Sequence, residues 1–127
     1  MRLIGGVIAS LVTWAIIATI LNLGLRHSWA AYAAVEKAMT FTFPMMVARL
    51  GISGVSSLVA GFVAAWVEQR RRAPIIAGAI LVILFLPVHY GLWGKFPPWY
   101  HLTFLASLPL LGWAGGTLWR PRLATTR

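Results

Sequence analysis

One charged residue lies well inside an apolar segment of this sequence: Arg49, in the run PMMVARLGISG. It follows Pro44 by five positions, which on a helix is about 7 Å. An arginine at that depth either extends back to the membrane interface or turns inward, where an unpaired charge costs several kcal/mol. Glu36 and Asn22 are the partners that the sequence offers on that side. A solute bound by Arg49 is the functional alternative.

Three histidines and three tyrosines are expected on the same side of the membrane as Arg49. They are His27, His89, His101, Tyr32, Tyr90 and Tyr100. Three imidazoles suit Zn²⁺ or Cu²⁺, but no two of these histidines have a local ligand spacing such as HxxxH, and histidine is also ordinary at a wet interface. We therefore predict no metal, no other cofactor and no catalytic residue. The positions do predict a polar cluster in the outer third of the protein, formed by Asn22, Arg49, His89, Tyr90 and His101.

The chain lacks cysteine and aspartate, and its only acids are Glu36 and Glu68. This excludes disulfides, thiolate metal sites and iron–sulfur clusters. It also leaves no aspartate to hold Mg²⁺ for phosphoryl transfer. Neither glutamate is placed inside an apolar segment, which argues against a carboxylate proton relay in the bilayer. Because His89 and His101 have no evident carboxylate to orient them, the sequence favours a protein that is not an enzyme.

Membrane-spanning helices must position these side chains. Of the 127 residues 60% are hydrophobic and 10% are charged, against about 25% charged in globular proteins. A spanning helix takes about 20 apolar residues, so the chain has room for four and for no soluble module. We predict an all-α fold in one domain, residues 1–127, with spans at about 3–23, 44–67, 74–93 and 98–119 and a basic tail at 120–127. A cleaved signal peptide is the alternative for the first span, although its apolar core is only about 7–15 residues long.

The first connection, residues 24–43, repeats apolar and aromatic side chains at helical spacing. They are Trp29, Tyr32, Val35, Met39 and Phe43. This pattern predicts an interfacial amphipathic helix in the first outer loop, with an ordered aromatic loop as the alternative.

Two further patterns concern how the spans pack. Pro87 and Pro109 lie inside spans and predict kinks, and a kink at Pro87 would open a shallow cavity toward the outer side. On a helical wheel of 44–67, small residues take one half and bulky residues the other. In lipid, small faces let helix backbones approach closely. We predict helix packing, within the bundle or between copies, through Ser53, Ser57, Gly61, Gly112 and Gly116.

The basic residues predict the orientation. The net charge is +9, and the basic side chains gather at the ends of apolar segments, so the expected partners are the bilayer and its anionic headgroups, not nucleic acid. One side carries Arg2, Arg70, Arg71, Arg72, Arg120, Arg122 and Arg127, and the other Arg26, Lys37 and Lys95. The positive-inside rule then places both termini in the cytoplasm. The chain as a whole resembles small proteins of the bacterial inner membrane, and we expect it in that membrane.

Three functions follow from these patterns. The sequence favours a non-enzymatic accessory or structural subunit that packs with itself or with a larger membrane complex, since packing signals are present without catalytic ones. The alternative is a small transporter or channel for a polar or anionic solute that uses the outer arginine, histidine and asparagine cluster. A third hypothesis is an enzyme or metal site at the outer rim.

Overall fold

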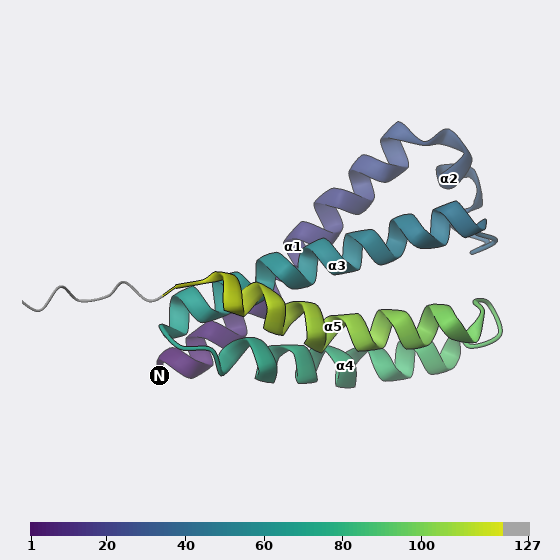
Figure 1. Ribbon diagram of the computed structural model, residues 1–127. Helices are drawn as coiled ribbons and strands as arrows, with labels where there is room; N and C mark the ends of the chain where they lie inside the picture. Colours follow the sequence, from purple (N-terminus) through teal and green to yellow (C-terminus); the bar gives the residue numbers. More distant parts are fainter. Residues whose placement is uncertain (121–127) are drawn as a thin grey trace, which may run out of the picture.

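The computed structural model of the protein describes residues 1–120, and this part of the chain is all-helical (Figure 1). Its elements are α1 (Arg2–Ser28), α2 (Ala30–Val35), α3 (Phe43–Glu68), α4 (Ala73–Gly91) and α5 (Pro98–Leu118). The all-α prediction is confirmed. All of the predicted basic tail except Arg120 lies outside the described residues.

Three of the helices, α1, α3 and α4, are long and apolar enough to cross a membrane. The fourth long helix, α5, has 21 residues but is less apolar, because its sequence includes Tyr100, His101, Ser107 and Pro109. The predicted fourth span therefore stays a prediction.

Proline and a left-handed residue set several of the helix ends. Pro44, Pro74 and Pro98 each lie in the first turn of α3, α4 and α5, where a helix does not need the missing N–H. Gln69 ends α3 with a φ of 63°. The short turn that follows brings α4 back beside α3.

The first connection differs from the prediction. Helix α1 continues five residues past the expected end at residue 23, and the Ser28 hydroxyl donates to the Gly24 carbonyl oxygen at 2.6 Å near its end. Hydropathy marks where the apolar run stops, whereas the backbone goes on bonding to itself in polar sequence. Only six residues then form α2, and Met39 has a φ of 55°, so the helix of this loop is short and its place at a membrane interface stays a prediction.

Close backbone contacts hold the bundle together at one end. A Cβ atom on Gly61 would overlap the backbone of Gly112, and one on Gly115 would overlap the backbone of Leu58. These contacts let α3 and α5 approach without side chains between them. A Cβ on Gly78 would likewise lie 2.8 Å from the Cα of Pro109, so α4 meets α5 in the same way.

The small-residue half of α3 faces the other helices. Ser53, Ser57, Gly61 and Ala64 are buried, and the indole N–H of Trp14 on α1 donates to the Ser57 hydroxyl at 3.1 Å. The bulky half carries exposed side chains at Val55, Val59, Phe62 and Trp66. Because the small residues and Gly112 are occupied within one chain, they do not offer a surface to a second copy.

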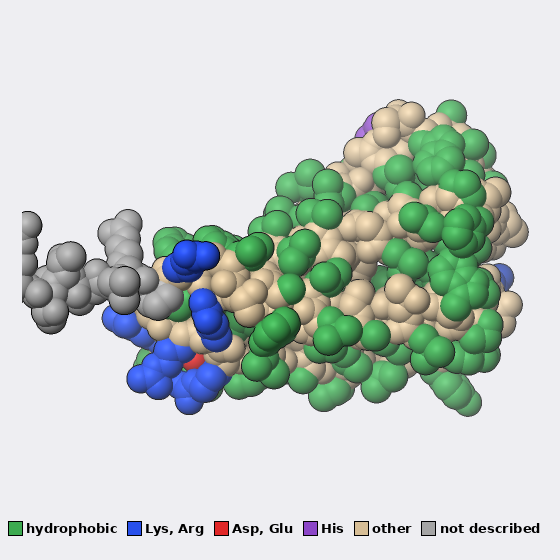
Figure 2. Space-filling model, viewed as in Figure 1, with side chains coloured by type: hydrophobic (Ala, Val, Ile, Leu, Met, Phe, Trp, Pro, Cys, Tyr) green, Lys and Arg blue, Asp and Glu red, His purple; other side chains and the backbone are tan. Residues whose placement is uncertain are grey.

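A cluster of basic side chains lies at one end of the molecule. Figure 2 shows Lys and Arg side chains gathered where the N-terminus, the α3–α4 turn and the end of α5 meet, with hydrophobic side chains over the body. We call this the basic end and the opposite one the α2 end. At the basic end Glu68 is only 3% exposed; its carboxylate accepts from the Ala73 amide and from Arg72 Nε at 3.1 Å.

Candidate functional site

Arg49 turns into the bundle at the α2 end. Its Nη1 donates to the Tyr32 hydroxyl at 2.8 Å and its Nε to the Tyr100 hydroxyl at 3.2 Å. The guanidinium carbon also lies 4.8 Å from the centre of the Phe41 ring, a cation–π contact. Neither of the partners expected from the sequence, Glu36 and Asn22, is hydrogen-bonded to it directly.

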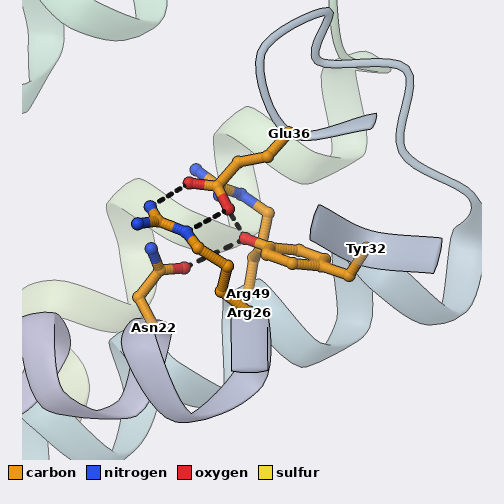
Figure 3. A network of polar contacts seen from close by, with 5 residues as sticks. All are labelled: Asn22, Arg26, Tyr32, Glu36 and Arg49. Carbon is orange, nitrogen blue, oxygen red and sulfur yellow. Dashed lines mark hydrogen bonds and ion pairs between the residues drawn. The ribbon is translucent and has the colours of Figure 1, made fainter. Parts of the chain in front are cut away.

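Tyr32 links the arginine to α1. This side chain on α2 is fully buried, and its hydroxyl donates to Asn22 Oδ1 at 3.0 Å while it accepts from Arg49 (Figure 3). Its ring stacks on Phe41 at 5.2 Å between centroids. A short helix of six residues is therefore held in place by one buried tyrosine, and with it the wall that faces Arg49.

A second arginine takes the carboxylate of this network. Arg26 on α1 binds Glu36 through both Nε, at 2.9 Å, and Nη2. The hydrogen bond from Arg26 holds the pKa of Glu36 below its ordinary value of 4.5, although partial burial opposes the shift. The network therefore holds two guanidinium groups, those of Arg26 and Arg49, and one carboxylate, which is bound by Arg26 alone, so one positive charge is in excess.

The Arg26–Glu36 pair predicts a loss of stability in acid. Because the folded state lowers the pKa of Glu36, the pair stabilises the fold above pH 4.5 and loses this contribution as the pH falls through the lower pKa. The effect is small, since the Arg26 side chain is 43% exposed. The midpoint of thermal unfolding in detergent should fall between pH 7 and pH 3 in the wild type. Glu36→Gln should lack this decrease. Equal pH dependence of the two proteins would contradict the pairing.

A cavity of about 240 Å³ lies beside Arg49. It is lined by residues of all four long helices: Trp14, Ala18, Asn22, Arg49, Ile52, Ser53, Phe85, Tyr100 and Phe104. Ser53 is one turn further along α3 than Arg49; its hydroxyl is buried and has no hydrogen-bond partner within the described chain. The cavity therefore combines a cation and an unused hydroxyl with aromatic walls.

His89 and His101 form a buried pair next to this cavity. Their Nδ1 atoms lie 2.6 Å apart, and His101 Nε2 lies 3.4 Å from the Trp93 carbonyl oxygen. Which histidine donates in this pair depends on the tautomer; with the His101 proton on Nε2, toward the carbonyl, His101 Nδ1 would accept from His89. Phe85, Phe104 and Tyr100 pack around His89.

The predicted polar cluster is brought together only in part. Asn22 and Arg49 share a network, and the two histidines form their own pair, linked to it through Tyr100. Tyr90 points away and is 86% exposed. Among the residues that the structure describes, no three His, Cys, Asp or Glu side chains come together in a group that could hold a metal ion.

Several site residues were missed from the sequence. The sequence placed Tyr32 and Tyr100 only on the outer side, and it singled out neither Phe41 nor Trp14, because their common neighbour is reached through tertiary packing. Ser53 was assigned to helix packing. Its spacing from Arg49, four residues on one helical face, was a signal that could have placed it in the site.

Comparison with protein-family models, with curated proteins and with solved structures gives no match, so the chemistry of this site alone carries the functional conclusion.

Proposed function

We propose that the protein crosses the bacterial inner membrane four times, with both termini and the basic end in the cytoplasm. Helix α5 has 21 residues and at 1.5 Å per residue spans about 31 Å, close to the hydrocarbon thickness of a bilayer. The arginines of the basic end would meet the anionic headgroups of the inner leaflet. The α2 end, with its aromatic rings, would then lie at the outer interface.

We further propose that the protein binds a small polar or anionic solute in the cavity beside Arg49. The observation that carries this proposal is the charge of the site: no carboxylate oxygen of the described residues lies within 4.0 Å of the Arg49 guanidinium. Glu36 is engaged by Arg26, and Glu68 lies at the other end of α3. In a membrane an uncompensated arginine is costly, and a bound anion would offset that cost.

The cavity would supply the solute with hydrogen-bond donors held in place by the fold. Tyr32 and Tyr100 fix two nitrogens of Arg49, which leaves Nη2 without a hydrogen bond among the described residues. A carboxylate or phosphate oxygen would accept from that nitrogen in a charge-assisted bond. Because four helices meet at the cavity, tilting one pair against the other would open it, as a transporter requires.

Solute binding can be tested on the purified full chain in detergent. Arg49→Gln should weaken the binding of small carboxylates, measured by calorimetry, by about tenfold to a hundredfold, because a charged hydrogen bond is worth about 1.5–3 kcal/mol. Lys95→Gln, which removes an exposed charge near the same end, is the matched control and should bind as the wild type does. If Arg49→Gln does not fold, Arg49→Lys is the second variant, because it keeps the positive charge. Unchanged affinity in the folded Arg49→Gln variant would refute the proposal.

The accessory or structural subunit favoured by the sequence is the second candidate. Helix α1 exposes Ile4, Ile8, Val12, Ile16 and Ile20 at intervals of four, a stripe that lipid or a further membrane helix would cover. Crosslinking in native membranes from the α1 stripe shows whether lipid or a further membrane helix covers it. Exposed positions on α5 are the control. Crosslinks to lipid alone would remove this candidate.

A further inference from the structure

We infer that the solute is a carboxylate with a compact aromatic or branched apolar body, bound with its charge at Arg49 and its body among Trp14, Phe85 and Phe104. This inference rests on the proposed function of the cavity and narrows it to one class of ligand. The hydrogen-bond donors and the aromatic rings that line the same cavity carry the argument.

The polar residues that line the cavity offer hydrogen-bond donors to two oxygen atoms of a ligand. Arg49 presents Nη2, and the Tyr100 hydroxyl, which accepts from Arg49 Nε, has no acceptor for its own hydrogen within the described chain. Ser53 adds a hydroxyl that is only 2% exposed and has no partner there. A carboxylate has two oxygens with about four lone-pair sites, which matches three donors around one group.

The lining of the cavity also includes a set of tilted aromatic rings. Trp14 and Phe85 lie 5.1 Å apart between ring centroids at 58°, and Phe85 and Phe104 lie 5.1 Å apart at 69°. Rings placed edge to face in this way bury a flat or branched apolar group well. A hydrated inorganic anion would leave these walls in contact with water, so an apolar body on the ligand gains affinity.

The volume limits the size of that body. Pockets for drug-sized ligands hold about 300–1,000 Å³, and this cavity of about 240 Å³ is smaller. A single ring with a carboxylate fits this space, whereas a long acyl chain would extend outside it.

Cationic and neutral ligands fit less well. The Arg26, Arg49 and Glu36 network has a net positive charge, which disfavours a protonated amine. Its one carboxylate, that of Glu36, is already paired with Arg26. A neutral alcohol would pair with one donor and leave others buried without partners, which costs free energy.

Binding of five probes to the full chain in detergent tests the inference: benzoate, acetate, chloride, benzyl alcohol and laurate. We expect benzoate to bind at least about tenfold more tightly than acetate, chloride or benzyl alcohol, since charge and apolar burial both contribute. Arg49→Gln should remove the benzoate signal and so control for its partition into detergent. Ser53→Ala should weaken benzoate binding severalfold. Ser56→Ala is the matched control, because its hydroxyl already bonds to the Ile52 carbonyl oxygen at 2.7 Å and does not line the cavity.

The outcomes separate this inference from the function on which it rests. Equal affinity for benzoate and acetate or chloride would overturn the apolar body and leave an anion site standing. Tighter binding of laurate would overturn the compact body. Benzyl alcohol binding as tightly as benzoate would overturn the need for a carboxylate. If no anion binds to the folded wild type, the proposed function itself fails.

Discussion

Gly61→Ala is expected to prevent α3 and α5 from packing, with a loss of at least about 3 kcal/mol, the upper end of what added volume costs in a tight core. The new methyl group would overlap the carbonyl oxygen, the carbonyl carbon and the Cα of Gly112. All three are backbone atoms, so no side chain can rotate to make room. Thermal unfolding in detergent, followed by circular dichroism, should show a large fall in the midpoint or no folded protein at all.

Gly51→Ala is the matched control for this substitution. It lies on the same helix, and a Cβ there would meet nothing within 4 Å. The change should be neutral or stabilising, because alanine is favoured over glycine in a helix by about 1 kcal/mol. Equal unfolding midpoints for the two variants would mean that α3 and α5 do not approach each other at Gly61.

Glu68→Ala is expected to cost about 1–3 kcal/mol, because it leaves the buried Ala73 amide without its acceptor. The carboxylate is almost fully enclosed, and it joins the end of α3 to the first turn of α4. Removing it should loosen the α3–α4 turn. Thermal unfolding of the full chain should therefore begin at a lower temperature than in the wild type. Amide hydrogen exchange should increase most around Ala73.

Two further variants separate the hydrogen bond from the Ala73 amide to Glu68, which caps the start of α4, from the ion pair between Glu68 and Arg72. Glu68→Gln keeps an acceptor for the Ala73 amide and should lose less stability than Glu68→Ala. Arg72→Gln removes a side chain that is 61% exposed, so the surface part of the pair should contribute little. If Arg72→Gln were as destabilising as Glu68→Ala, the ion pair and not the cap would hold the turn.

The helices could be predicted from the sequence because their signals are local. Apolar runs give their places, and Pro44, Pro74 and Pro98 give their starts. The division of α3 into a small and a bulky half also follows from residue size alone. The end of α1 was placed too early, because hydropathy records what the bilayer tolerates and not how far backbone hydrogen bonds continue.

The site was predicted less well because its contacts join distant parts of the chain. Arg49 could be singled out as a charge in apolar sequence, but Tyr32 is 17 positions before it and Tyr100 is 51 after it. No periodicity links such positions. His89 and His101 pair because an antiparallel turn brings α4 beside α5, which local ligand spacing does not reveal.

The close backbone contacts between α3 and α5 at Gly61 and Gly115 have a consequence for how this protein could evolve. Where backbone meets backbone, almost every replacement is forbidden, so the half of the bundle nearest the basic end has little freedom to change. The half with Arg49 is filled by rings and hydroxyl groups, and these can be exchanged for others of similar size. Chains with the same close backbone contacts could thus change a few aromatic residues beside Arg49 without changing the fold.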